Sequence, residues 1–583
     1  MDIRGKEITP RETIENAKRI FDKLGLGYRF ERIDSGANTF SHELEIYFKD
    51  MPEYTIHSSG GKGITEEYSM ASAVGEMIEE LSNLILLWDI DYTKLDKYKE
   101  KYVSVNEKVL NIKEVLKLNG YIKELREKYG DEIIKKHFES GIKITGKDAE
   151  VCLKLTNIKD DTTCYIPFSH LTYETNGMCA GNTEEEALCQ GIFELFERFS
   201  HNHILKNKIN CPLLPEHIYE ETKSMGIIKK IESYDNNRYK ISIKDCSLGL
   251  GIPIVGIIIF DKKNKKYKTS FGCSYSYNIA LERCLTELLQ TATVGTIQTM
   301  EIFSNKNEYD KNNIVNMCIS GEAIYPDEFL SDLNPAYEFK EDINLGKDNK
   351  EIFENISKII KKNNINLYYL DSSFLGINSY KIMSVDLVDG ALLGIYDNTY
   401  VHKGTYKNLD SEKITLKEAE NKLNDILYGT IDYGNIPNII GVTNDKEFKN
   451  KDCTPLLDLL TSVLAIKTGD IEMFLKYSGY FLDSYNGENI DGKELLKCLR
   501  HLYMYNLKGT SLEITVDILK KIYEEDIIKT CISSMGNFDN IIKLFGFFDR
   551  NGNGKFNLCN IRLYNKYVEL IKSIRNIRID NNK

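Results

Sequence analysis

The stretch Thr175-Asn-Gly-Met-Cys-Ala-Gly-Asn-Thr183, followed closely by Glu194-Leu-Phe-Glu-Arg198, says more about the fold than any other part of the chain. A segment with two glycines leads to a pair of glutamates, Glu194 and Glu197, three residues apart. Residues at this spacing lie on the same face of a helix. Because two neighbouring carboxylates repel each other unless a cation lies between them, the pair predicts a site for a hard, oxygen-binding metal such as Mg²⁺.

A helix is predicted over residues 183–206. Thr183 is a suitable N-cap, and Glu186 three residues later completes a capping-box pattern. The helix has one polar and one apolar face. The polar face carries Gln190, Glu194, Glu197 and His201, and the apolar face carries Leu188, Ile192, Leu195 and Phe199. An ordinary amphipathic helix with its polar side in water would give the same pattern, so this helix alone does not decide the function.

A second glycine-containing stretch, Gly60-Gly-Lys-Gly63, precedes another pair of glutamates, Glu76 and Glu79. Apolar residues at helical spacing predict a long helix over 69–88. The glycines resemble a phosphate-binding loop only superficially, because the following Ser or Thr and the long glycine spacing are missing. We therefore interpret residues 60–63 as a tight turn.

A third helix is predicted over residues 278–291. It places Arg283, Glu287 and Gln290 on one face and leucines on the other. If the three helices converge, their carboxylates enter one cleft, which requires more than one divalent cation, or cations together with arginines. Arginine forks suit phosphate oxygens. A triphosphate bridged by metal ions would therefore satisfy both signs of charge.

The composition indicates an ordinary globular protein of at least two domains, with 583 residues of which 42% are hydrophobic and 28% charged. A net charge of −12 argues against direct binding to nucleic acids or anionic membranes, which require basic patches. No apolar run is long enough to span a membrane, and the first residues lack a signal-peptide core. The 13 cysteines include no Cys-x-x-Cys pair, so we expect buried free thiols in the reducing cytoplasm. His57 has no ligand-like spacing and is interpreted as an ordinary histidine.

Two regions of different character follow each other. Residues 1–405 alternate helical and strand-like runs and predict an α/β domain. Beyond them, short helical runs split by Gly, Asn and Asp predict a separate all-α domain of helical hairpins over 414–583. A tetratricopeptide-like array would fit this region, although no clear repeat period is present. The predicted helices span 414–427, 455–468, 470–480, 492–505, 513–525, 526–535 and 560–575.

Residues 549–560 are similar to a calcium-binding EF-hand loop. Asp549, Asn551 and Asn553 match ligand positions, and Gly554 matches the turn. The last position holds Asn560, where a bidentate Glu is needed. A plain turn between two helices explains the same residues.

Taken together, these motifs resemble the YcaO family, in its stand-alone type with a helical C-terminal domain. The resemblance holds in order and spacing across residues 1–405. It is carried by Gly61-Lys-Gly63, residues 72–82, residues 175–198, Asp245 with Gly251-Ile-Pro253, and residues 280–290.

The resemblance implies the family's own α/β fold, which binds ATP and Mg²⁺. It implies that Mg²⁺ is held by Glu76, Glu79, Glu194, Glu197 and Glu287. It implies contacts to ATP from Asn176, Gln190, Arg198 and Arg283, and catalytic roles for both arginines. Near the N-terminus, the matching segment implies that Lys6 and Thr13 also lie close to the nucleotide.

The resemblance also implies a reaction, namely ATP-dependent activation of a backbone amide in a peptide or protein substrate. Azoline-forming members end in a proline-rich tail, whereas this chain ends Arg578-Ile-Asp-Asn-Asn-Lys583, which favours the stand-alone group. That group is associated with a radical methylthiotransferase that modifies a ribosomal protein, so both are implied partners. The alternative is a nucleotide-binding scaffold whose helical domain recruits a partner. The sequence leaves the oligomeric state open, with a homodimer as one option.

Overall fold

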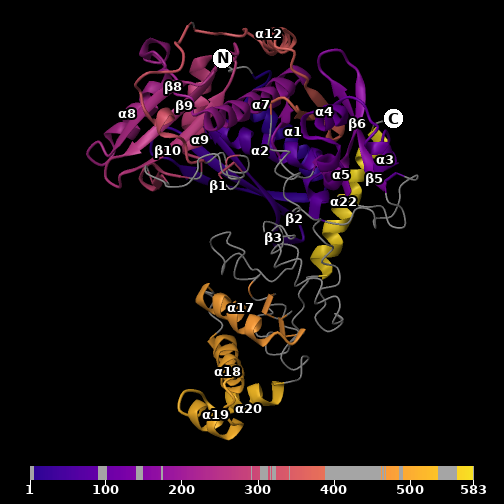
Figure 1. The fold of residues 1–583 in the computed structure, drawn as a ribbon, viewed down its shortest axis with the longest axis vertical. Helices are drawn as coiled ribbons and strands as arrows, with labels where there is room; N and C mark the ends of the chain where they lie inside the picture. The colour runs from indigo at the N-terminus through magenta and orange to yellow at the C-terminus, as the bar shows by residue number, and fades with distance from the viewer. Residues whose placement is uncertain are drawn as a thin grey trace.

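The computed structural model describes residues 6–89, 101–139, 149–171, 175–290, 292–297, 299–301, 323–340, 342–387, 468–484, 490–535 and 561–581, with short stretches between 313 and 317 and between 458 and 466. It confirms the predicted α/β fold with helices towards the C-terminus (Figure 1). The predicted helix over 414–427 and the loop that resembles an EF-hand lie outside the described residues.

The first sheet is antiparallel and has the order β1-β2-β3. Helices α1 and α2 pack against it and against each other. Apolar side chains of both helices, including Phe21 and Met77, are fully buried at this contact. The elements are α1 (Pro10–Lys23), β1 (Leu26–Asp34), β2 (Phe40–Phe48), β3 (Met51–Gly63) and α2 (Glu66–Ser82).

The helix predicted over 69–88 is shorter in the structure. Helix α2 ends at Ser82, with Asn83 as its C-cap. Leu84 has a φ of 61°, in the left-handed region that a regular helix excludes. The chain continues as a short 3₁₀ helix, η1 (Ile85–Asp89). The apolar run therefore belongs to two elements that share one hydrophobic core.

The second sheet has six strands in the order β4-β5-β12-β13-β7, with β6 paired to β5. The strands are β4 (Lys108–Asn111), β5 (Ala149–Asn157), β6 (Thr163–Pro167), β7 (Met178–Gly181), β12 (Tyr368–Asp371) and β13 (Asn378–Met383). The helices around it are α3 (Ile112–Val115), α4 (Tyr121–Tyr129), α5 (Asp131–Glu139), α6 (Phe168–Leu171) and η5 (Ser373–Leu375). Strand β7 leads directly towards the long helix α7, so this sheet positions residues 175–183 and the start of that helix.

The third sheet has the order β11-β10-β9-β8. Its strands are β8 (Tyr239–Asp245), β9 (Ile254–Asp261), β10 (Lys266–Cys273) and β11 (Met300–Glu301). The remaining helices of this part are α7 (Glu184–Asn207), η3 (Glu216–Ile218), α8 (Lys223–Ser233), α9 (Tyr277–Leu288), η4 (Val294–Thr296), α11 (Asp327–Leu330) and α12 (Asn349–Lys362). Helix α7 contacts β7 and β13 of the second sheet and β10 of the third, so it joins the two sheets.

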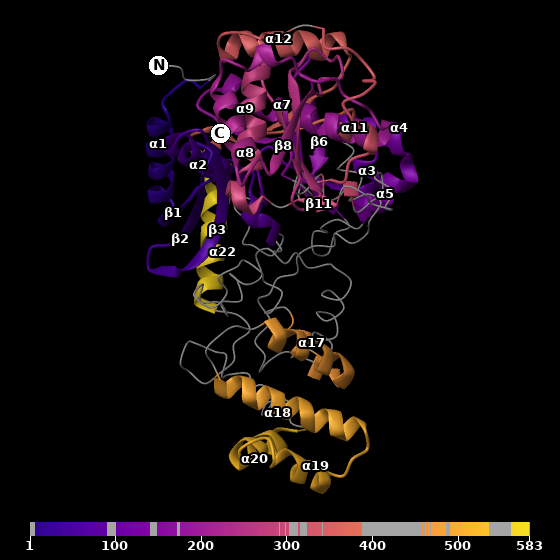
Figure 2. The ribbon, with the colours of Figure 1, turned by 90° about the vertical axis from the view of Figure 1, so that its left-hand side faces the viewer.

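The helices near the C-terminus fall into two groups. Helices α17 (Ile471–Ser484), α18 (Ile490–Leu507), α19 (Leu512–Leu519) and α20 (Glu525–Ser534) pack on one another, with α18 in contact with the other three. Figure 2 shows this group below the sheets, whereas α22 (Ile561–Asn581) lies beside them. Buried residues of α22, including Ile571, belong to the same core as α1 and α2. Helix α22 is thus packed with residues of the 1–405 region, from which the sequence analysis had separated it.

Two simpler expectations concern the cysteines and the membrane. The ten cysteines within the described residues are all free and buried, as predicted. None of the described helices combines the length and the apolar character needed to cross a lipid bilayer.

Candidate functional site

The three helices that carry the predicted site residues share a local design. Each follows a strand with a glycine that lies against the helix backbone, and each is capped by Thr65, Thr183 or Ser276. A Cβ at Gly61 of β3 would lie 2.0 Å from the backbone oxygen of Ser69 in α2. Likewise, a Cβ at Gly181 would lie 2.5 Å from the backbone nitrogen of Ala187, and a Cβ at Gly272 would lie 2.4 Å from the backbone oxygen of Ala280. Any side chain at these glycines would push strand and helix apart, so the glycines fix the position of each helix.

The glutamates of α2 lie in a strongly desolvated environment. Burial raises the pKa of Glu76 to about 7, the neighbouring Glu80 adds to the rise, and Lys62 opposes it. Burial also raises the pKa of Glu79 well above its usual range, and the carboxylates of Glu194 and Glu76 raise it further. Because Glu194 belongs to α7, this interaction places the carboxylates of the two helices close together. Their ionised forms therefore need additional positive charge.

The glutamates of α7 are held by backbone N–H groups. Oε2 of Glu194 accepts a hydrogen bond from the N–H of Gly177 at 3.1 Å, and Oε2 of Glu197 accepts one from Cys273 at 3.1 Å. Burial raises the pKa of Glu194, while Arg198 and the N–H of Gly177 oppose this rise. Each carboxylate thus has one oxygen fixed by the protein backbone.

Lys62 belongs to the site, although its sequence pattern did not predict a role for it. Residues 60–63 form the end of β3, paired with β2 through Ser41 and Lys62, and not the tight turn that we predicted. Because successive side chains of a strand point to opposite faces, Gly61 and Gly63 face α2 while Lys62 faces away. Lys62 forms an ion pair with Glu287 of α9. Desolvation and the nearby Arg283 lower the pKa of Lys62 to about 8, and the glutamates of α2 and α7 oppose this shift.

The two arginines have donors left over for a ligand. Nη1 of Arg283 donates to Oε1 of Gln190 at 2.9 Å, which connects α9 to α7. Nη1 of Arg198 donates to the backbone oxygen of Met317 at 3.0 Å. Nε of Arg198 and Nε of Arg283 are buried without a hydrogen-bond partner. A buried charged donor without a partner is costly, so both sites favour an anionic ligand.

The predicted residues near the N-terminus gather at the start of α7. Nζ of Lys6 lies 3.1 Å from Oε1 of Glu186, and Oγ1 of Thr13 donates to Oδ1 of Asn182 at 3.3 Å. The N–H of Glu186 donates to the N-cap Thr183, as the capping-box pattern predicted, but its carboxylate binds Lys6 and Asn182. The structure therefore brings Lys6 and Thr13 to the helix that carries Gln190. The remaining predicted residue, Asn176, is buried in the turn before β7.

Two histidines differ from their predicted surroundings. His201 is buried, 3.0 Å from Oη of Tyr325 and against the ring of Phe271, so it belongs to the core and not to a polar helix face. Burial lowers the pKa of His201 well below its usual range. In contrast, Nε2 of His57 lies 2.6 Å from Oε2 of Glu80, beside Glu76. The partner of His57 lies on another element, so its spacing in the sequence gave no sign of this pair.

The donor set fits magnesium bound together with a nucleotide. Among the residues that the structure describes, no three carboxylate, imidazole or thiol groups meet as a closed metal cage would require. Mg²⁺ is usually held by one or two carboxylates together with water and substrate phosphates. The glutamate pairs of α2 and α7 offer such ligands, and the buried arginine donors next to α7 suit phosphate oxygens.

Comparison with known proteins gives a family match to most of this region. A family model described as the YcaO cyclodehydratase, ATP- and Mg²⁺-binding, matches residues 60–387. A protein of Escherichia coli K12, named ribosomal protein S12 methylthiotransferase accessory factor YcaO, is 26% identical over 506 residues, which cover 82% of this chain and 83% of that protein. An uncharacterized protein of Haemophilus influenzae is 27% identical over 399 residues, which cover 66% of each chain.

Solved structures resemble the chain more distantly. A heterocyclase in complex with substrate and cofactor has 17% identity and a TM-score of 0.44, and the match covers 66% of this chain but 53% of the heterocyclase. YcaO from Methanopyrus kandleri bound with AMPPCP and Mg²⁺ has 14% identity and a TM-score of 0.41, with coverage of 70% of this chain and 98% of that one.

Proposed function

Because this chain belongs to the YcaO family, whose members bind ATP and Mg²⁺, we propose that it uses bound ATP to activate a backbone amide of a peptide or protein. The observation that carries the proposal is the shared charge environment of α2, α7 and the end of β3. There, partly buried carboxylates with a raised pKa lie beside Lys62 and two arginines with unused donors. The ionised carboxylates of such a site need more positive charge, which metal ions would supply. The free arginine donors need an anionic partner, which phosphate would supply.

The proposed roles are those that the family resemblance implies, and the positions of the side chains support them. Five glutamates, from α2, α7 and α9, would hold Mg²⁺: Glu76, Glu79, Glu194, Glu197 and Glu287. Arg198 and Arg283 would bind phosphate oxygens through the donors that are unpaired in the protein. Asn176 and Gln190, with Lys6 and Thr13 at the start of α7, would contact the rest of the nucleotide.

The bound nucleotide would supply a phosphoryl group to the oxygen of the substrate amide, which turns that oxygen into a leaving group. The contribution of the protein is to hold the reacting groups together and to neutralise charge. Arg198 follows the glutamates of α7 on the same helix, and its Nε is held in a buried position. We assign to Arg198 the stabilisation of negative charge that grows during phosphoryl transfer.

The E. coli relative is named as an accessory factor for methylthiolation of a ribosomal protein. We extend that role to this chain as part of the proposal. A radical methylthiotransferase or its ribosomal-protein substrate would then be the partner, and the helices α17–α20 would be the region that binds it.

The decisive experiment follows the oxygen atom. A candidate peptide with an ¹⁸O-labelled backbone carbonyl is incubated with the protein, ATP and Mg²⁺, and the released phosphate is analysed by mass spectrometry. Amide activation transfers the label to phosphate, whereas ordinary hydrolysis takes the new oxygen from water. Label found only from solvent water would remove the proposed chemistry.

A second candidate is a nucleotide-binding scaffold without amide chemistry. It is favoured by exposed apolar side chains around α18 and α19, which could recruit a partner protein. These include Leu507, Leu512, Ile514 and Ile522, each more than half exposed. ATP binding without turnover in the presence of candidate substrates, together with nucleotide-dependent partner binding, would favour the scaffold.

A further inference from the structure

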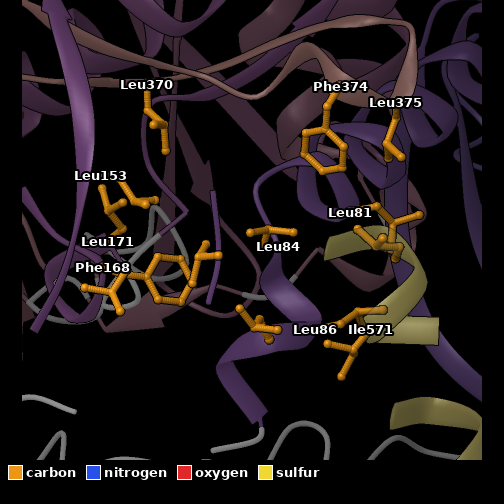
Figure 3. Close-up of a cluster of buried hydrophobic side chains, with 14 of the residues drawn as sticks. Leu81, Leu84, Leu86, Leu153, Phe168, Leu171, Leu370, Phe374, Leu375 and Ile571 are labelled. Atoms are coloured by element: carbon orange, nitrogen blue, oxygen red, sulfur yellow. The ribbon is translucent and has the colours of Figure 1, made fainter. Parts of the chain in front are cut away.

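Helix α22 completes the hydrophobic core under α2. Its side chains Tyr567, Leu570, Ile571 and Ile574 are almost fully buried and belong to the same core as the apolar face of α2. Figure 3 shows Ile571 of α22 close to Leu81 of α2 and to Leu86 of η1. Oη of Tyr567 also donates to the backbone oxygen of Leu86 at 3.2 Å. The helix is therefore packed against the segment that follows the glutamates of α2.

Arg578 is the polar anchor of this contact. Its side chain is 2% exposed and lies over the ring of Phe374, 5.2 Å from the ring centroid. Its guanidinium makes contacts of 3.4–3.5 Å with three groups at the end of α2 and before η5: the backbone oxygen of Ser82, Oγ of Ser372 and the backbone oxygen of Asp371. A buried arginine of this kind holds the segments that it bridges, because its five donors have a fixed geometry.

A chain of hydrogen bonds leads from Arg578 to a predicted metal ligand. Oγ of Ser372 donates to Oδ1 of Asn83 at 3.0 Å. Nδ2 of Asn83 in turn donates to the backbone oxygen of Glu79 at 2.8 Å, and the N–H of Asn83 donates to the same oxygen at 3.0 Å. Because Asn83 is the C-cap of α2, this network holds the backbone of the last turn of the helix, from which the Glu79 side chain extends.

The chain is anchored on this same body on both sides of helices α17–α20. Before them, Val385 is buried in the core that contains α22, and Leu387 is buried in the neighbouring core. After them, α22 packs as described above. Helices α17–α20 pack among themselves. The described residues on either side of helices α17–α20 are therefore held in the cores of this body.

We propose that α22 positions Glu79 for Mg²⁺ through the contact of Arg578 with Ser372, which in turn bonds Asn83. This inference rests on the proposed function, because it assumes that Glu79 is a metal ligand. Arg578 is a positioning residue that acts on the metal through α2. Loss of its guanidinium leaves the last turn of α2 less well fixed, and residues that orient metal ligands in this way typically change metal affinity by about 10- to 100-fold.

The test measures the Mg²⁺ concentration that gives half-maximal ATP binding to the full chain, by titration calorimetry. Arg578→Ala removes the start of the connection and Ser372→Ala interrupts its middle. If Arg578→Ala does not fold, Ser372→Ala still tests the connection, because it leaves the side chains of α22 unchanged. Lys566→Ala is the matched control, because Lys566 lies on the same helix but pairs with Asp50 at the β2–β3 turn, 2.7 Å away. We expect the half-maximal Mg²⁺ concentration to rise about tenfold in both test variants and to stay unchanged in the control.

Two further measurements are needed. The first distinguishes a positioning role of this connection from a general loss of stability, and the second distinguishes failure of the positioning role from failure of the proposed metal site. A double variant of Ser372→Ala with Asn83→Ala should shift the Mg²⁺ requirement by less than the two single shifts combined, because both act through one connection. If Glu79→Gln raises the Mg²⁺ requirement but Ser372→Ala does not, the positioning role is wrong and the metal site stands. If Glu79→Gln leaves the half-maximal Mg²⁺ concentration unchanged, Glu79 is not a metal ligand. In that case both the proposed metal site at Glu79 and the positioning role of Arg578 are wrong.

Discussion

Lys62 at the end of β3 forms an ion pair with Glu287 of α9, so one lysine joins the first sheet to the helix that follows β10 of the third sheet. The same lysine is attracted by the carboxylates of Glu76, Glu194 and Glu197. Lys62 therefore neutralises part of the negative charge of these glutamates when no metal is bound. Mg²⁺ would neutralise the same charge when a nucleotide binds.

Lys62→Met should therefore matter most when no metal is present. We expect a loss of about 2–4 °C in the melting temperature in EDTA, because the carboxylates lose a cation that interacts with them. Saturating Mg²⁺ and ATP should reduce this loss, since the metal supplies positive charge. Thermal unfolding with and without ligand checks both values, with Lys263→Met as control, because Lys263 pairs with Asp235 on the surface. An equal loss in both conditions would contradict the proposed exchange of charge.

Glu194→Gln should weaken Mg²⁺-dependent ATP binding by about tenfold or more while the protein remains folded. The substitution keeps an oxygen that can accept from the N–H of Gly177 but removes the negative charge that would hold the metal. Calorimetry with ATP at fixed Mg²⁺ measures the effect. The control is Glu184→Gln, an exposed carboxylate in the first turn of the same helix. Equal affinities in the wild type and Glu194→Gln would exclude Glu194 as a ligand.

Asp261 offers a test of stability away from the site. Its buried carboxylate accepts from Arg238 at 2.5 Å and from the N–H groups of Lys263 and Asn264 at 3.0 Å, and Arg238 lowers its pKa from 3.8 to about 2. The stabilisation is complete above pH 3.8 and is lost as the pH falls towards 2. Asp261→Asn should therefore cost about 2 kcal/mol at pH 7 and much less near pH 2.

Unfolding by urea at pH 7 and at pH 2.5 measures that difference for Asp261→Asn. Asp235→Asn is the matched control, because Asp235 is more exposed and makes a surface ion pair with Lys263. A difference between wild type and Asp261→Asn that is the same at both pH values would show that ionisation of Asp261 does not contribute.

Local sequence patterns predicted the helices of the site well, but they did not predict which distant elements pack against those helices. The spacing of Glu194 and Glu197 and the N-cap Thr183 are properties of one continuous segment, and α7 begins where they indicated. Lys62 was missed because a glycine-rich tetrapeptide gives no sign of which strand it pairs with. The contact between β3 and α2 that requires Gly61 is set by tertiary packing.

The position of α22 shows the same limit on a larger scale. A helix near residues 560–575 follows from apolar spacing, and α22 is present, although it extends to Asn581. Its partners in the core include η5 and the end of α2, the latter almost five hundred residues earlier, as the contact of Arg578 with Ser82 shows. No periodicity within a helix reveals which distant surface its apolar face will cover.

This packing changes what we expect of a truncated protein. Residues 1–405 alone would expose the apolar surface that Leu570, Ile571 and Ile574 cover, at a cost of roughly 1.5–3 kcal/mol for each large side chain removed. We expect this truncation to be poorly soluble. Residues 1–405 joined by a flexible linker to 561–583 should be soluble and should bind ATP with Mg²⁺. Sedimentation and calorimetry check both proteins, and a stable 1–405 fragment with full ATP affinity would show that α22 is dispensable.

The last prediction concerns Arg198, whose Nη1 is fixed by the backbone oxygen of Met317 while its Nε has no partner. A group that stabilises charge formed only in the transition state lowers the rate without an equal loss of ground-state binding. Arg198→Ala should therefore slow phosphate release by on the order of 100-fold or more, while ATP affinity falls by a much smaller factor. Single-turnover kinetics and calorimetry on one preparation give the two numbers, with Lys206→Ala as the control on the same helix. If affinity and rate fall by the same factor, Arg198 binds ATP in the ground state and has no special role in the transfer.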